Sequence, residues 1–424
     1  MTNNSKSICV VGLQWGDEGK GKIVDYLSAD ADYVIRFNGG NNAGHTVVLG
    51  DKTYKFHHIP SGAVAGKKLL IAQGCVINPK ILLEEIKLLS SNKISVNLMI
   101  DPRVHIVMPY HQLLDAATEE WKGKNATGSL KLGIGYCYED KNNRLGIRFE
   151  DLIDKKILSQ KIKTYFPLKK AVIEKVYGKK VTLSVPDIIK EYFTYAILLK
   201  KYLGDVAQKV DSVIAKKHLL FETAHGTFLD PAFGTYPYTV APHAIAGGLF
   251  TGVGIGPMNI GVIGVVKAYT TRVGNGPFLT ELEGESGKIL QKRGQEFGTT
   301  SGRVRRCGWL DLTMLRSAVK LNNVKSIALT KLDVLSAFSE IKVATHYIFH
   351  GEKYRYFPSQ MNTLTSNRPL FKSFKGWKSD ISKNIKFKDL PKNCRIYLDF
   401  ISRELGVRIK YISVGPDRNA IIKN

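Results

Sequence analysis

A glycine-rich loop near the N-terminus constrains the fold of this chain more than any other stretch. Residues 12–23 read GLQWGDEGKGKI and follow the short apolar run Ile8 to Val11. Residues 22–27, just after the glycines, have the apolar spacing of a helix. A strand, a glycine loop and a helix in this order aim backbone N–H groups and the positive end of the helix at one anion. The stretch therefore predicts a polyphosphate site, to which Lys20 and Lys22 add charge.

The loop differs from a P-loop at one position that matters for metal binding. Gly16 to Lys22 has the spacing G-x-x-x-x-G-K, but Ile23 stands where a P-loop NTPase places Ser or Thr on Mg²⁺. A metal here needs another oxygen ligand. Asp17 is a candidate, and its carboxylate is equally suited to act as a general base on a substrate. Because this short pattern also occurs by chance, a solvated turn is the alternative interpretation.

Composition indicates a large globular chain. Its 424 residues, 44% of them hydrophobic, suffice for a large core in one domain or in several closely packed ones. The polar start, Met1 to Ser7, lacks the apolar segment of a signal peptide. The five cysteines are far apart and show no C-x-x-C spacing, which argues against a disulfide framework and against a zinc site. We therefore expect a cytoplasmic protein without a membrane span.

The net charge of +25 raises the question of nucleic-acid binding. The lysines, however, are spread along segments such as 155–217 and 353–388, with no basic tail, RNA-binding signature or zinc finger. We therefore expect a solvated lysine-rich surface rather than a nucleic-acid partner. Such a charge also attracts small anionic substrates, which agrees with a phosphate loop.

Strand and helix signals alternate along the chain and predict an α/β fold with a large, mostly parallel central sheet. The predicted strand Asp32 to Phe37 leads into a second glycine-rich loop, residues 38–46. Polar residues gather at the predicted strand ends, where open α/β sheets bind ligands. The lysine-rich stretch Leu152 to Leu219 has a helical pattern and is expected to form a peripheral helical subdomain within a single domain, residues 1–424.

A second set of residues suggests guanine recognition. The apolar strand Ser326 to Thr330 is followed by Lys331 and Asp333. A carboxylate there can accept hydrogen bonds from the N1–H and 2-amino groups of guanine, while the lysine stem covers the base, so GTP is favoured over ATP. The turn Ser413 to Pro416, after a predicted strand at 407–414, is placed to close over the same base. An ordinary ion pair at a strand end is the alternative.

Two further stretches point to transfer chemistry. The loop 297–306 combines hydroxyls with Arg303 and Arg305, which can bind a carboxylate or a phosphate bidentately. His45 lies in the second glycine loop, where it can donate a proton or a hydrogen bond to a transferring phosphoryl group. An exposed basic loop and a structural histidine are the alternatives. Together with the other motifs, these residues suggest phosphoryl transfer from GTP to a molecule that then meets a carboxylate-bearing partner.

These motifs, in this order, resemble the adenylosuccinate synthetase family. The resemblance runs from about Ile8 to Arg418 and includes residues 14–22 (QWGDEGKGK), 42–46 (NAGHT), 299–306 (TTSGRVRR), 330–333 (TKLD) and 415–418 (GPDR). It implies a GTP- and Mg²⁺-dependent ligase of purine biosynthesis that joins IMP to L-aspartate, usually as a homodimer.

The resemblance also implies roles for individual residues. Asp17 would remove the N1 proton of IMP so that O6 attacks the γ-phosphate of GTP, while Lys20 neutralises charge on the transferring group. His45 would stabilise the departing GDP oxygen. The aspartate amine would then displace phosphate from C6 of 6-phosphoryl-IMP. Asp17 and the carbonyl oxygen of Gly44 would hold Mg²⁺.

The other matching positions are binding residues for the three substrates. The GTP positions are Gly16, Glu18, Gly19, Gly21, Lys22, Gly44, Thr46, Arg305, Lys331, Leu332, Asp333, Ser413, Val414 and Gly415. The IMP positions are Asn42, Ala43, Arg144, His225, Thr239, Val240 and Arg303, of which Arg144 would reach the neighbouring subunit's site. The L-aspartate positions are Thr299, Thr300, Ser301, Arg303 and Arg305.

Departures from the family pattern are concentrated in the part that would bind IMP. Leu130 replaces a phosphate-binding threonine, Leu132 an arginine, His225 a glutamine beside the purine, and Val240 a threonine. Two alternatives follow. One is a paralogous ligase that couples aspartate to a different purine nucleotide, such as a 2-amino purine. The other is a GTP-binding protein without catalysis.

Overall fold

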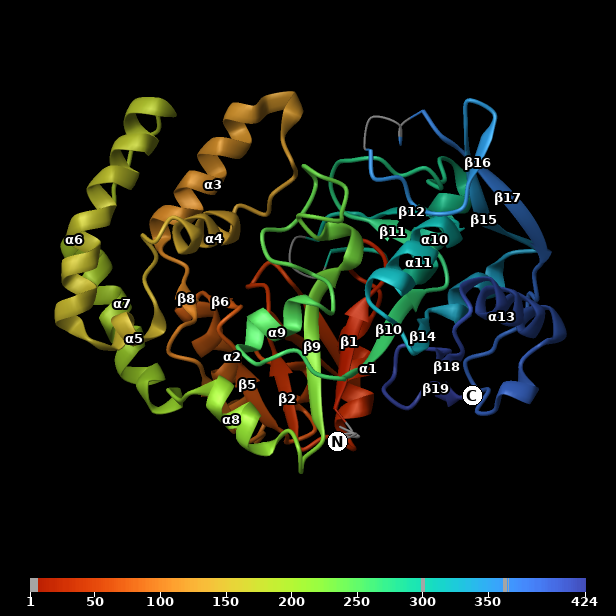
Figure 1. Cartoon of the computed structure of the whole chain (residues 1–424), viewed down its shortest axis with the longest axis horizontal. Coiled ribbons are helices and arrows are strands. Elements are labelled where there is room, and N and C mark those ends of the chain that lie inside the picture. Colours follow the sequence, from red (N-terminus) through yellow and green to blue (C-terminus); the bar gives the residue numbers. More distant parts are fainter. Residues whose placement is uncertain (1–6, 299–301, 361–363, 365) are drawn as a thin grey trace.

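The fold is described by a computed structural model that covers residues 7–298, 302–360, 364 and 366–424. Its centre is a nine-stranded sheet in the order β19-β18-β14-β10-β1-β9-β2-β5-β7, parallel except for the edge pair β18–β19 (Figure 1). These strands are β1 (Ile8–Gly12), β2 (Tyr33–Arg36), β5 (Lys68–Ile71), β7 (Leu98–Ile100), β9 (Leu219–Gly226), β10 (Gly261–Lys267), β14 (Ser326–Thr330), β18 (Ile409–Ser413) and β19 (Ile421–Lys423). The predicted α/β fold with a mostly parallel sheet is confirmed.

The central strands are apolar on both faces because helices cover both sides of the sheet. In β1, Cys9 and Val11 belong to one core cluster and Val10 to the other. The main helices are α1 (Lys20–Ser28), α2 (Pro79–Ser91), α3 (Pro109–Lys122), α4 (Ile134–Asn142), α5 (Phe149–Ile153), α6 (Lys155–Ala171), α7 (Val185–Leu199), α8 (Val206–Val213), α9 (Gly248–Val253), α10 (Glu285–Gly294), α11 (Leu312–Leu321) and α13 (Lys392–Leu405). None of the helices in the described ranges is long and apolar enough to cross a membrane.

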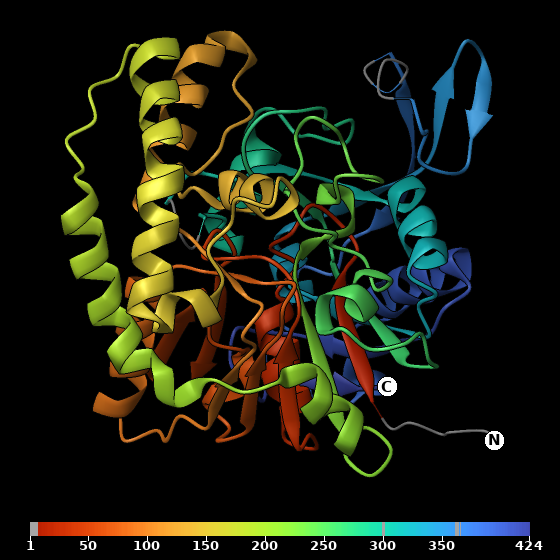
Figure 2. The ribbon, with the colours of Figure 1, turned by 60° about the vertical axis from the view of Figure 1, so that its left-hand side comes forward.

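Short strands form smaller pairings around the main sheet. They are β3 (His45–Leu49) with β4 (Lys52–Phe56), β6 (Val76–Ile77) with β8 (His105–Ile106), β11 (Thr270–Arg272) with β12 (Arg306–Gly308), and the group β13 (Leu310–Asp311), β15 (Glu340–Phe349), β16 (Glu352–Tyr354) and β17 (Arg368–Lys375). The last group projects from the body of the molecule, on the side opposite α6 and α7 (Figure 2).

The lysine-rich middle of the chain is helical, as the sequence predicts. Helices α6 and α7 stand beside α3 at one flank of the molecule (Figures 1 and 2). One face of α7 is buried, and its members are Ile188, Tyr192, Ala196 and Leu199. Buried Lys169 of α6 pairs with Asp140 of α4, which also contacts His111 of α3 at 2.9 Å. This buried network anchors the flank to the helices next to the site.

The parallel strands end at one edge of the sheet, and the predicted loops meet there. The loops after β1, β2 and β9 begin at Leu13, Phe37 and Thr227, and those after β14 and β18 begin at Lys331 and Val414. Open α/β sheets bind their ligands at this edge. The fold therefore brings the separate sequence motifs together.

Candidate active site

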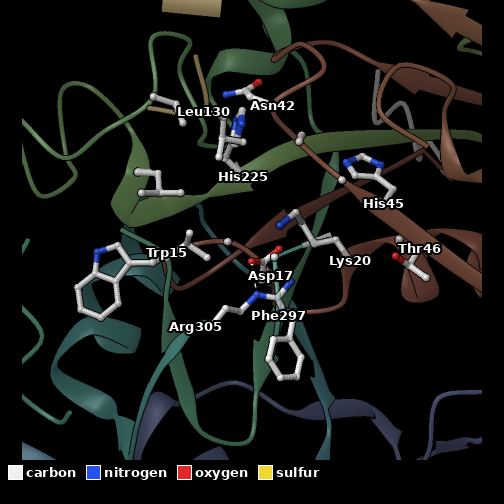
Figure 3. A pocket seen from close by; sticks show the side chains of 18 of the residues that line it. Trp15, Asp17, Lys20, Asn42, His45, Thr46, Leu130, His225, Phe297 and Arg305 are labelled. Atoms are coloured by element: carbon white, nitrogen blue, oxygen red, sulfur yellow. Dashed lines mark ion pairs between the residues drawn. The ribbon is translucent and has the colours of Figure 1, made fainter. Parts of the chain in front are cut away.

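A cavity of about 1400 Å³ lies at this edge of the sheet. Its walls come from both glycine loops, from the loop 127–135, from the segments after β9 and β14, and from the turn at 413–416. Figure 3 shows Asp17, Lys20 and Arg305 in the middle of the labelled side chains, His45 and Thr46 on one side, and Asn42, His225 and Leu130 on another. The cavity is large enough for more than one ligand of nucleotide size.

Hydrogen bonds to the side chain of Glu18, which is fully buried, fix the backbone of the first glycine loop. Its carboxylate accepts the N–H groups of Gln14 and Gly16 at 3.0 and 2.9 Å and pairs with Lys20 at 2.6 Å. A Cβ at Gly12 would lie 2.3 Å from this carboxylate, so the close approach requires glycine. Glu18 is therefore a support beneath the loop, and Asp17, not Glu18, faces the cavity.

Asp17 is held by Arg305 at the centre of the cavity. Arg305 Nε lies 2.6 Å from Asp17 Oδ2, and Arg305 Nη1 donates to Glu296 Oε2 at 2.7 Å. Burial opposes the charge of Arg305, but its two carboxylate partners outweigh that effect and raise its pKa. The guanidinium thus fixes a carboxylate that remains about one quarter exposed to the cavity.

His45 is oriented by a buried carboxylate on the neighbouring strand. Its Nδ1 lies 2.5 Å from Glu222 Oε1, and Ser61 Oγ donates to the same carboxylate. Burial raises the pKa of Glu222, but the pairing with His45 and the bonds from Ser61 outweigh it and hold that pKa below its usual value. The ionised carboxylate places the hydrogen of His45 on Nδ1. His45 lines the cavity, and its Nε2 is buried without a partner among the described residues.

The end of the cavity predicted to hold guanine contains Lys331, Asp333, Ser413 and Gly415. Burial raises the pKa of Asp333. Lys22 also reaches this end: its Nζ donates to Ser413 Oγ at 2.7 Å and to the carbonyl oxygens of Gly415 and Ala420. Burial lowers the pKa of Lys22 to about 8. Lys22 therefore fixes the turn 413–420 rather than the glycine loop.

The opposite end combines apolar side chains with unsatisfied polar atoms. Leu130, Leu132 and Val240 line it. Both ring nitrogens of His225 and Oδ1 of Asn42 are buried without hydrogen-bond partners in the described part of the chain. Burial and the nearby cations lower the pKa of His225 well below its usual value, so the ring is neutral. Buried polar atoms are normally paired, and these atoms are placed to be paired by a ligand.

The loop 127–133 at this end is organised by Glu119 of α3. Its carboxylate accepts the hydroxyl of Thr127 at 2.6 Å and the N–H groups of Thr127, Gly128 and Ser129 at 3.2, 2.8 and 3.0 Å. Burial raises the pKa of Glu119, but these bonds outweigh it and lower the pKa to about 2. Three successive N–H groups converging on one carboxylate form an anion nest.

Glu119 is expected to stabilise the protein in a pH-dependent way. Its folded pKa lies below the value of about 4.3 in an unfolded chain, so its contribution is complete above that pH and is lost as the pH falls toward 2. We expect Glu119→Gln to lower the free energy of unfolding at pH 7 by roughly 3 kcal/mol, and by roughly half as much at pH 3. Urea unfolding at both pH values measures this. Exposed Glu120→Gln is the matched control, and equal midpoints for the two variants would contradict the assignment.

The structure does not bring every predicted residue to the cavity. Arg144 is exposed just beyond α4 and is absent from the cavity wall, and Arg303 donates to the carbonyl oxygen of Gly128 from outside that wall. Leu332 and Val414 are buried behind it. Thr299, Thr300 and Ser301 lie outside the described residues. The other predicted positions, Glu18 apart, line the cavity.

Three glutamates in or beneath the wall were missed by the sequence analysis, namely Glu119, Glu222 and Glu296. Each is 8% exposed or less. Glu222 had a readable signal, because an acid inside the apolar run LLFETA must be paired when that run is a central strand. Glu296 directly precedes the arginine loop, but its partners Lys267 and Lys331 are distant in sequence.

The parallel sheet, and the first glycine loop beside a cavity of this size, define the protein as a nucleotide-binding α/β enzyme. A family profile described as adenylosuccinate synthetase matches residues 9–422. The chain is 46% identical over 420 residues to adenylosuccinate synthetase from Carboxydothermus hydrogenoformans, covering 98% of both chains. It is 47% identical over 421 residues to that from Desulforapulum autotrophicum, with the same coverage.

Solved structures of related synthetases have the same fold. Fully ligated adenylosuccinate synthetase from Plasmodium falciparum superimposes with a TM-score of 0.93 at 36% identity, over 99% of this chain and 100% of that one. A cyanophage S-2L succinoaminodeoxyadenylate synthetase bound to dGMP and dATP, 18% identical with a TM-score of 0.62, shares the fold. The chain belongs to the adenylosuccinate synthetase family. Its activity is that of the family, a GTP-dependent ligase of purine biosynthesis, which implies GTP, IMP and L-aspartate as substrates.

Proposed function

We propose that GTP occupies the Lys331–Asp333 and Ser413–Gly415 end of the cavity and IMP the His225–Val240 end, with the γ-phosphate between them. One observation carries this proposal. Asp17, Lys20 and His45, whose Nε2 has no partner in the described part of the chain, line the middle of one cavity whose two ends differ in chemistry. The first end offers a carboxylate and a lysine for guanine, and the second offers neutral imidazole and amide groups for a 6-oxopurine.

In the first step Asp17 accepts the N1 proton of IMP, and the electron pair shifts to O6. O6 then attacks the γ-phosphorus of GTP, the bond to the β,γ-bridging oxygen breaks, and GDP leaves. Lys20 neutralises charge on the transferred group. His45 acts as an imidazolium: Glu222 accepts its Nδ1–H, and its Nε2–H donates a hydrogen bond toward the departing oxygen. Little covalent work is left for the protein, so positioning and charge provide most of the acceleration.

In the second step the aspartate amine attacks C6, the C6–O6 bond breaks, and phosphate leaves with O6 and with the proton that the amine nitrogen loses. Phosphorylation makes this possible because it converts a poor oxide leaving group into a good one. Arg303 and Arg305, with residues 299–301, are proposed to bind the carboxylates of aspartate. The ion pair of Arg305 with the carboxylate of Asp17 supports this proposal, because it shows the guanidinium facing a carboxylate at the cavity.

Mg²⁺ fits the donors at the centre of the cavity. It is usually held by one or two carboxylates together with substrate phosphates, and Asp17 and the carbonyl oxygen of Gly44 both belong to segments that line the wall. We propose these two oxygens as its protein ligands. When bound, Mg²⁺ would polarise the phosphates of GTP and neutralise their charge.

The remaining proposals concern assembly and location. We propose a homodimer in which Arg144 of one chain binds the IMP phosphate in the other, because Arg144 is exposed and its own cavity does not contain it. We further propose that the chain acts in the cytoplasm, and that it is a single domain in which residues 152–219 are a peripheral helical part.

The acceptor is tested by measuring phosphate release from GTP with Mg²⁺ and aspartate, in the presence of IMP, GMP, dGMP or no acceptor. Product masses identify the ligated purine. We expect adenylosuccinate from IMP, with Leu130, His225 and Val240 acting as a tolerated variant of the pocket. Activity with GMP or dGMP and none with IMP would overturn the assignment of IMP and mark these residues as a substrate switch.

A further inference from the structure

Three distant segments of the chain meet at the carboxylate of Glu296, which is fully buried. Its Oε1 accepts from Lys267 at 2.9 Å and from the hydroxyl of Tyr269, and it lies 3.3 Å from Lys331 Nζ. Its Oε2 accepts from Arg305 at 2.7 Å. Three cations therefore share one anion that has no contact with solvent. Neither Glu296 nor Lys267 lines the cavity, whereas Lys331 and Arg305 do.

Glu296 also forms the base of the hairpin that carries the arginine loop. The N–H of Arg305 donates to its carbonyl oxygen at 2.9 Å, and Phe297 forms a bridge with Val304. One oxygen of the Glu296 carboxylate thus holds Lys331, at the end of the cavity proposed to bind guanine. The other oxygen and the backbone hold the arginine that contacts Asp17.

We propose that Glu296 is a positioning residue that couples the guanine site to the aspartate site. Guanine bound at Lys331 and Asp333 then favours binding of aspartate by Arg303 and Arg305. The inference rests on the proposed function. A base that fixes Lys331 also fixes Glu296, and thereby the hairpin base, in one arrangement. Aspartate then binds to an Arg305 whose position is already fixed, which gives positive cooperativity.

The coupling is measured by isothermal titration of L-aspartate into the full chain with IMP and Mg²⁺, with and without GDP, which supplies the base without turnover. We expect GDP to lower the Kd of aspartate in the wild-type protein by about fivefold or more. In Glu296→Gln we expect the ratio of the two Kd values to fall to within about twofold of one. The loss should appear in this ratio, which a merely structural role would leave unchanged.

Lys267→Met is the matched control. It removes a buried partner of the same carboxylate and is expected to lower stability, yet it leaves Glu296 bound to both Lys331 and Arg305, so the ratio should stay at the wild-type value. If Glu296→Gln does not fold, the double variant Lys267→Met/Glu296→Gln takes its place, because it removes one buried charge of each sign. The ratio of its two aspartate Kd values, without and with GDP, should equal one.

Three results would overturn the coupling. The first is a wild-type ratio of aspartate Kd values in a folded variant that lacks Glu296. The others are no effect of GDP on the aspartate Kd of the wild-type chain, or a Kd ratio near one in Lys267→Met as well. Each of these leaves the proposed function in place, because aspartate still binds. If the wild-type chain bound no aspartate with IMP and GDP present, the proposed function itself would fail together with the coupling.

Discussion

Replacement of Asp17 by Asn is expected to lower kcat by about 10³-fold or more, within the range of a lost general base combined with a lost positioning contact. The amide cannot accept the N1 proton of the acceptor, and it also removes the charge that Arg305 holds. Binding of GTP measured without Mg²⁺, for which Asp17 is a proposed ligand, should change by less than about threefold, because the guanine end of the cavity is untouched. Phosphate release gives kcat, and titration with GTP gives the Kd.

The control for this variant is Asp30→Asn, an exposed carboxylate just beyond α1 that lies outside the cavity. It should match the wild-type chain in both measurements. Normal turnover in Asp17→Asn would rule out Asp17 as the base. Loss of GTP binding together with turnover would instead make Asp17 part of the phosphate site alone.

The second large effect is expected at the pair His45 and Glu222. His45→Asn should lower kcat by about 10²-fold, the size of one lost hydrogen-bond donor to a developing oxyanion. Glu222→Gln should lower kcat by about tenfold, because a neutral amide no longer balances the charge of the imidazolium that donates from Nε2. The KM for GTP should change little in either variant, since the hydrogen bond is made to the departing oxygen.

Steady-state kinetics of the two single variants and of the double variant separate these roles. Because Glu222 is proposed to act through His45, the double variant should be no slower than His45→Asn. Wild-type kcat in Glu222→Gln would show that this carboxylate only stabilises the fold. Multiplied losses in the double variant would show that Glu222 acts independently of His45.

The sequence predicted the site best where each motif is continuous along the chain. The glycine loop, the segment 42–46 and the Lys331–Asp333 pair all reach the same cavity because they follow parallel strands that end at one edge. The periodicity at residues 32–37, 326–330 and 407–414 also predicted β2, β14 and β18, with ends that differ by two residues or fewer.

Partners that are distant in sequence could not be predicted in the same way. Lys22 has the spacing of a phosphate lysine, yet the fold carries the turn 413–420 over it, so its ammonium group is satisfied by carbonyl oxygens there. The partners of the buried glutamates are also distant in sequence. A single sequence gives the charge of Glu222 or Glu296, but only the packing of strands and loops identifies the cation that balances it.

Transfer of the γ-phosphoryl group of GTP to O6 of IMP is tested most directly with IMP labelled by ¹⁸O at O6. The reaction is run with GTP, Mg²⁺ and L-aspartate, and the released phosphate is analysed by mass spectrometry. We expect one ¹⁸O atom in each phosphate and none in the adenylosuccinate, because cleavage of the C6–O6 bond leaves the labelled oxygen on phosphorus. Unlabelled phosphate formed along with adenylosuccinate would contradict it.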